Sequence, residues 1–121
     1  MERPERGKLR LRIVLRPGAA IGPGKVDLLE AIGETGSIRA AGSRFKMSYR
    51  RAWSLVAELN AMFRTPLVRA ETGGRGGGGA TLTPLGRQVV ARFRAMEEGA
   101  WSVVEPDFRR LAEQLSRDKA K

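Results

Sequence analysis

The sequence contains no cysteine and no histidine among its 121 residues. Without cysteine the chain can form no disulfide framework and offers no thiolate nucleophile. Without histidine it lacks the commonest general base and the usual side-chain ligand of transition metals. We therefore expect no metal site and no cofactor, and an enzyme built on this chain would have to rely on carboxylates or lysine.

Acidic side chains are scarce in the middle of the chain. Residues 36–94 hold 11 basic side chains and only two acidic ones, Glu58 and Glu71, which do not pair at helical spacing. A carboxylate pair for acid–base catalysis is absent there, so the sequence argues against an enzyme. The same imbalance, within a net charge of +10, favours a polyanionic partner. Arginine makes up 18 of the 23 basic residues, and its guanidinium can bond phosphate or guanine through two parallel hydrogen bonds.

Long apolar runs are missing as well. No stretch approaches the ~20 apolar residues that a membrane-spanning helix needs, and the N-terminal MERPERGKLR lacks the apolar core of a signal peptide. We therefore expect a cytoplasmic protein with no membrane partner. The length fits one domain with a modest core and an extension.

The stretch 36–60 has the pattern of two helices separated by a tight turn. Ile38 and Ala41 share a face of the first helix, residues 45–47 make the turn, and Ser48 stands where a helix N-cap belongs. The second helix carries an apolar stripe, which we expect to be core throughout, at Ala52, Trp53, Val56, Leu59 and Phe63. This pattern predicts a helix-turn-helix.

The other face of the second helix begins with Tyr49, Arg50, Arg51 and Ser54. Positive charge in a first turn opposes the helix dipole, so stability does not explain the two arginines. A solvated helix face is the alternative explanation. In the context of the turn, contact with DNA phosphates or base edges is favoured, and the sequence does not divide Arg50 and Arg51 between these two roles.

Residues on either side complete a small α+β fold. Residues 8–16 alternate as a half-buried strand, with Leu9, Leu11, Ile13 and Leu15 on its inner side, and residues 25–32 form a short helix closed by Gly33 or Gly36. After Phe63, strands at 67–70 and 80–83 enclose a glycine-rich loop, as in the wing of a winged helix. The loop either approaches phosphate or the minor groove, or is merely disordered. A dinucleotide fingerprint is rejected because a second strand, not a helix, follows the glycines.

Residues 85–115 continue at helical spacing, as one long kinked helix or two consecutive ones, since Gly99 and Pro106 interrupt them. Their apolar side chains are core or a dimer seam. We favour a dimer interface, formed by Leu85, Val89, Phe93, Met96, Trp101, Val104, Phe108 and Leu111.

The motifs together resemble the DNA-binding half of the ModE-type, molybdate-responsive transcription regulators, relatives of the LysR-type winged helix. The matching pieces cover roughly residues 8–95. They are Gly24-Lys25, Leu28-Leu29-Glu30, residues 34–38, SYRRAW at 48–53, Glu58, Asn60, TGGRGGGGA at 72–80, Leu82-Thr83 and Gly86. The resemblance implies a bacterial winged helix that dimerises through the helices after the wing and binds a palindromic operator in double-stranded DNA. We expect no molybdate binding by this chain, since it shows no oxyanion-binding motif and stops before the family's molybdate-binding module would fit.

The prediction is thus a mainly α, α+β winged helix-turn-helix regulator that acts as a homodimer. Its parts are a flexible arm at 1–7, a DNA-binding domain at 8–84 and a helical dimerisation segment at 85–121. Recognition helix 48–63 would enter the major groove, with wing 72–79 on the flanking backbone or minor groove. The expected DNA contacts are Lys46, Ser48, Tyr49, Arg50, Arg51, Ser54, Thr72, Gly74, Arg75 and Gly76. A non-specific architectural protein is the alternative.

Overall fold

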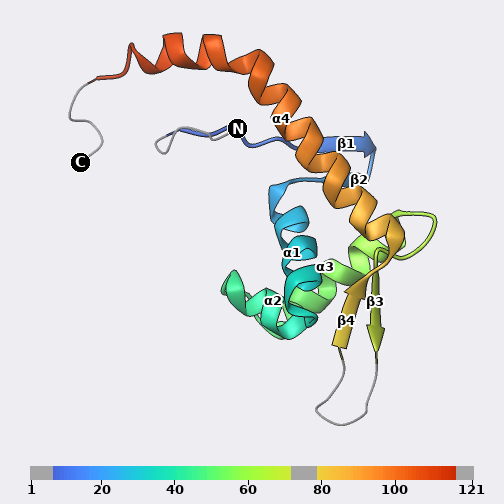
Figure 1. Ribbon diagram of the computed structural model, residues 1–121. Helices are drawn as coiled ribbons and strands as arrows, with labels where there is room; N and C mark the ends of the chain where they lie inside the picture. The colour runs from blue at the N-terminus through green and yellow to red at the C-terminus, as the bar shows by residue number, and fades with distance from the viewer. Residues whose placement is uncertain (1–6, 72–78, 117–121) are drawn as a thin grey trace.

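The computed structural model describes residues 7–71 and 79–116. Its elements in chain order are β1 (Ile13–Arg16), β2 (Ala19–Ile21), α1 (Pro23–Thr35), α2 (Ile38–Arg44), α3 (Tyr49–Met62), β3 (Val68–Glu71), β4 (Gly79–Leu82) and α4 (Pro84–Ala112) (Figure 1). The α+β winged helix-turn-helix with a long C-terminal helix is confirmed. The expected arm, apart from Gly7, and loop residues 72–78 lie outside the described part of the chain.

Each described helix begins at a recognisable sequence signal. Pro23 occupies the first turn of α1, and Gly36 ends that helix in the left-handed conformation with φ of 73°. Ser37, Ser48 and Thr83 cap the next three helices, each hydroxyl accepting a backbone N–H of the first turn. α1 is therefore longer than residues 25–32, because Gly33 continues the helix and only Gly36 stops it.

The core is built around α1, the one helix among the described elements that buries residues on most of its circumference. Val26, Leu28, Leu29, Ala31 and Ile32 are all fully buried. α2 and the wing strand β4 pack on α1, as does the first half of α4. The helix-turn-helix, the wing and α4 are thus mounted on one shared helix.

The N-terminal strand differs from its expected form. β1 covers only Ile13–Arg16 and pairs antiparallel with β2, a strand that the sequence did not reveal. The register shifts between Val14 and Arg16, and this irregularity turns Leu15 outward, 54% exposed. The prediction of nine alternating residues with Leu15 on the inner side was wrong for this reason.

Trp53 is not a core residue, contrary to expectation. Its side chain is 38% exposed, whereas Ala52 on the adjacent position is fully buried. α2 and α3 meet through small residues, and a Cβ added to Gly42 would lie 2.9 Å from the Cβ of Ala52. So close a contact leaves no room for an indole between the two helices, and Trp53 lies at the margin. Phe63 is half-buried and packs against the core.

α4 is one continuous helix of 29 residues with Pro106 inside it. Figure 1 shows it leaving the root of the wing and bending in its last third. Trp101 and Phe108 pack edge to face there, with ring centroids 5.0 Å apart. Gly7 lies against the Phe108 ring, so the start of the described chain packs on the end of α4. Within the described residues, no helix is long and apolar enough to cross a membrane.

Candidate nucleic-acid interface

The first turn of α3 presents polar and basic side chains to solvent. Ser48 caps the helix by accepting a hydrogen bond from the Arg51 amide at 3.0 Å. Arg50, Arg51 and Ser54 are all exposed, and the opposite side of the helix buries Ala52, Val56 and Leu59. The two guanidiniums are therefore held on a rigid helix end, outside the core.

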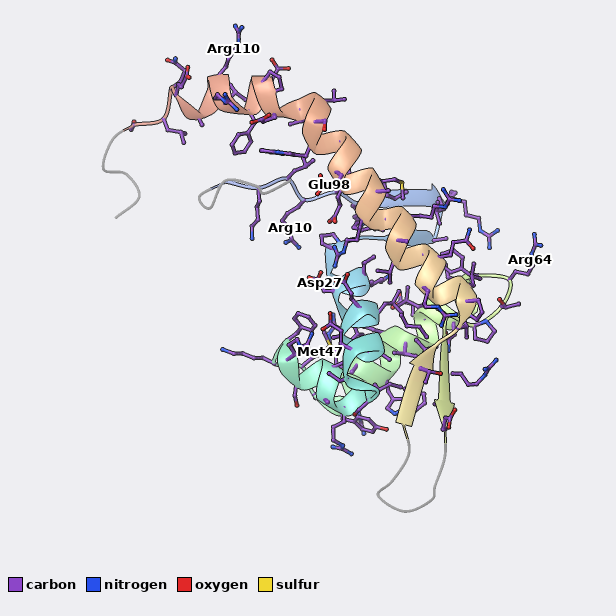
Figure 2. The ribbon with its side chains drawn as sticks, viewed as in Figure 1. Arg10, Asp27, Met47, Arg64, Glu98 and Arg110 are labelled. Atoms are coloured by element: carbon purple, nitrogen blue, oxygen red, sulfur yellow. The ribbon has the colours of Figure 1, made fainter. Side chains whose placement is uncertain are left out.

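The turn between α2 and α3 is tight and specific. Lys46 adopts the left-handed conformation with φ of 58°, unusual for a residue other than glycine. The amide of Met47 donates to the carbonyl of Gly42 at 3.0 Å and closes the turn. Lys46 is exposed beside the first turn of α3, and Figure 2 shows Met47 on the helix-turn-helix side of the molecule. The turn thus adds a cation next to those of the helix.

Arg51 lies on one flank of α3, over a small hollow of about 300 Å³. Arg12 and Lys25 line the same hollow, together with backbone at Gly22 and Gly24. The Lys25 ammonium is partly satisfied there, at 3.2 Å from the Ala20 carbonyl and 3.6 Å from a carboxylate oxygen of Glu58. The positive charge of α3 therefore continues onto the N-terminal segment, which sequence spacing alone did not connect to it.

The wing is anchored at its root to both α1 and α3. β3 and β4 pair antiparallel, with Val68 opposite Leu82 and Glu71 opposite Gly79. The Ala80 amide donates to the Gly36 carbonyl at 2.9 Å, which ties β4 to the end of α1. The expected wing contacts Thr72, Gly74, Arg75 and Gly76 lie outside the described residues.

Asn60 links α3 directly to the wing. Its Oδ1 accepts hydrogen bonds from the amides of Leu67 at 2.8 Å and Val68 at 3.0 Å, and its Nδ2 donates to the Val68 carbonyl at 3.2 Å. One side chain on α3 thus satisfies three backbone groups at the start of β3. The position of the wing relative to α3 follows from this side chain.

The residues expected to form a dimer interface divide into two groups along α4. Val89, Phe93 and Trp101 are buried within the protomer, and Leu85, Val104 and Phe108 are half-buried. Met96 and Leu111 are exposed, as are Val103 and Leu115 beside them. Much of the apolar stripe therefore covers the protomer's own core, and the remainder faces outward toward the far end of α4.

A cluster of charged side chains joins α1 to α4 and was not foreseen. Arg94 reaches Asp27 at 2.7 Å, Glu30 at 2.8 Å and Glu97 at 3.0 Å. Burial opposes the charge on the guanidinium, but the hydrogen bonds with Glu30, Asp27 and Glu97 outweigh it and raise the pKa of Arg94 above its usual range. Only the spacing of Arg94 and Glu97 was visible in the sequence. The α1 partners lie over sixty positions away, beyond any local pattern.

Comparison of the sequence with known proteins identifies a family for this chain. Residues 24–87 match the model of the bacterial regulatory helix-turn-helix proteins of the lysR family. That match runs from the start of α1 through the helix-turn-helix and the wing to the first turn of α4. It therefore contains every expected DNA contact.

Several curated relatives align with most of the chain. The molybdenum-pterin-binding protein MopB of Rhodobacter capsulatus is 45% identical over 94 residues, which are 77% of this chain and 35% of that protein. The molybdenum transport protein ModE of Azotobacter vinelandii is 39% identical over 99 residues, 82% of this chain and 35% of the relative. The DNA-binding transcriptional dual regulator ModE of Escherichia coli K12 is 33% identical over 88 residues, 70% and 34% of the two chains.

The chain spans about a third of the length of each of these relatives. The chain belongs to the lysR family of bacterial regulatory helix-turn-helix proteins, and its resemblance to the ModE-type regulators is confirmed.

Proposed function

We propose that this protein is a sequence-specific DNA-binding transcription regulator that acts as a homodimer. The observation that carries this proposal is the exposed first turn of α3. Two arginines and a serine project from a capped helix whose other side is fixed in the core. Residues 38–57 contain no acidic side chain, and among their described basic side chains only Arg44 pairs with a carboxylate, that of Glu34 at 2.5 Å. The basic side chains that remain fit a duplex, whose phosphates supply negative charge.

The outward face of α3 suits the major groove. Arg50, Ser54, Ala57 and Ala61 are all exposed and recur at spacings of three and four residues along one side of the helix. The arginine is long enough to reach base edges, and the small residues that follow it let the helix backbone approach the groove floor. Residues 48–63 therefore act as the recognition helix. The remaining cations, Lys46 and Arg51, lie beside it at positions suited to phosphates.

The wing is proposed to follow the flanking backbone or the minor groove. Its root is fixed to α1 by the bond between Ala80 and Gly36, and to α3 by Asn60. Residues 72–78 connect the last described pair, Glu71 and Gly79, in the sequence and lie outside the described residues. A basic, glycine-rich tip carried on a fixed root supports a second contact with the same duplex.

Two copies are proposed to pair through α4. The exposed apolar side chains Met96, Val103, Leu111 and Leu115 have no cover within the described protomer. A two-fold axis near this helix would place two recognition helices in successive major grooves, about one helical turn of DNA apart. The segment 85–121 is then the dimerisation segment of the chain, and 8–84 the DNA-binding domain.

The proposal is tested by selecting a binding site from random duplexes and measuring affinity for it by fluorescence anisotropy. The double variant Arg50→Ala/Arg51→Ala should lose about tenfold or more in affinity with little change in thermal stability, because a base-reading arginine contributes about 1–3 kcal/mol and Arg51 would contribute a phosphate contact. The control, Arg92→Ala/Arg110→Ala, removes the same charge from exposed positions on α4. Figure 2 shows Arg110 at the far end of that helix. Equal losses in both double variants would contradict the assignment of α3 as the recognition helix.

The same titration separates the proposal from the architectural alternative. A regulator should bind its selected site far more tightly than a scrambled duplex at physiological salt. A ratio near one would favour the architectural protein instead. The mass of the free protein and of its complex, measured by light scattering, tests the dimer independently.

A further inference from the structure

An exposed aromatic pair lies on the flank of α3 opposite Arg51. Tyr49 is 40% exposed and Trp53 is 38% exposed, one helical turn apart. Their rings meet edge to face, with centroids 6.3 Å apart and planes at 88°. The guanidinium of Arg39 on α2 stacks over the Tyr49 ring at 4.2 Å from its centroid. Large aromatics left at the surface of a small domain call for a function, since burial would stabilise the fold more.

The contacts hold the indole in one orientation and consume its only polar group. The Trp53 Nε1–H donates to the Tyr49 hydroxyl. Tyr49 is in turn held by the guanidinium of Arg39, which stacks on its ring. The indole therefore presents only carbon to the outside, in a fixed position. Such a surface is suited to an apolar group of a partner and offers nothing to a hydrogen-bonding one.

The charge around Tyr49 and Trp53 indicates what kind of partner this surface binds. Residues 38–51, which form α2, the turn and the first turn of α3, hold five basic side chains and no acidic one. A second copy of the chain would bring the same positive charge against this surface and be repelled. A duplex is attracted to it. In the major groove the apolar group of DNA is the C5-methyl of thymine.

The helical positions place the indole beside the proposed base-reading face. Successive residues of an α-helix are about 100° apart, so Trp53 lies about 60° from Arg50 around α3 and one turn closer to its middle. A helix that inserts Arg50 and Ser54 into the major groove thus carries Trp53 against one wall of that groove. Ala57 follows one turn later and leaves space for the approach.

We propose that Trp53 is a specificity-determining residue that contacts the methyl group of a thymine in each half-site, and that Tyr49 and Arg39 are positioning residues for its indole. This inference rests on the proposed function. It adds a preference for thymine at one defined place in the operator, alongside the hydrogen bonds made by arginine.

The test replaces each thymine of the selected duplex in turn by 2′-deoxyuridine, which removes the methyl group and keeps the base pair. At one thymine per half-site the wild-type protein should bind about fourfold more weakly, the factor for one apolar carbon returned to water. Trp53→Ala should bind the thymine and deoxyuridine duplexes equally, and Trp53→Phe should keep part of the preference. Tyr49→Phe should reduce the ratio of the two affinities without changing the melting temperature, because the indole is no longer held.

The outcomes distinguish this inference from the function on which it rests. A protein that prefers its selected site but is indifferent to every thymine methyl overturns the role of Trp53 and leaves the regulator intact. A Trp53→Ala variant that folds and keeps the full methyl preference overturns it as well. A protein with no sequence preference at all overturns both proposals. Exposed Val14, changed to Ala, is the matched control and should leave the methyl preference unchanged.

Discussion

Replacing Asn60 by alanine should destabilise the fold by about 3 kcal/mol. The side chain makes three hydrogen bonds to backbone groups of Leu67 and Val68, and each contributes about 1 kcal/mol net. Both residues are buried, 0% and 3% exposed, so water cannot readily replace the lost partner. For a chain of this size, a loss of this magnitude lowers the melting temperature by about 10 °C.

The measurement is urea unfolding followed by circular dichroism, which separates a change in the free energy of unfolding from a change in the slope with denaturant. Asn60→Asp is the matched control. It keeps the oxygen that accepts from both amides but sets a carboxylate oxygen against the Val68 carbonyl in place of the donor, so about 1–2 kcal/mol should be lost. An alanine variant within about 1 kcal/mol of the parent, or an aspartate variant as damaged as the alanine one, would refute the role given to this side chain.

Four further substitutions concern single positions. Gly86→Ala should cost at least about 3 kcal/mol in urea unfolding, because the new Cβ would lie 2.2 Å from the Leu67 carbonyl oxygen. Gly99→Ala in the same helix, with open space around it, should instead gain about 0.5–1 kcal/mol. Arg94→Ala should cost about 2–3 kcal/mol, since it leaves the buried Glu97 carboxylate without its cation. Lys46→Gly should leave unfolding within about 1 kcal/mol of the parent, because it relieves the left-handed backbone. The logarithmic salt dependence of its DNA affinity should fall by about 0.9 if Lys46 contacts one phosphate.

Local signals in the sequence predicted most of the fold. Ser48 and Thr83 cap helices as their types suggest, and the strands on either side of the glycines pair as a wing. These features depend on neighbours a few positions away, which the sequence displays directly. The predictions that were wrong depend instead on contacts between elements that are distant in the sequence. The exposure of Trp53 depends on how closely Gly42 approaches Ala52, and the outward turn of Leu15 depends on a register shift against β2.

The candidate site divides in the same way. Exposed Arg50, Arg51 and Ser54 could be chosen from the periodicity of α3, because the apolar stripe fixed which side remained free. The contact of Arg39 with Tyr49 could not be predicted from this periodicity, and neither could the hydrogen bonds of Asn60 to the wing. Each joins a helix to another element, and the distance between them is set only when the chain has packed.

The close approach of Gly86 to Leu67 couples the position of α4 to that of the wing root. The two segments touch through main-chain atoms, so no side chain can adjust to absorb a displacement of the wing root. From its first turn to Pro106 the helix is about 33 Å long at 1.5 Å per residue. A rotation of about 5° at the root would carry the bend at Pro106 through about 3 Å. A displacement of the wing root would therefore also move whatever packs against that distant end.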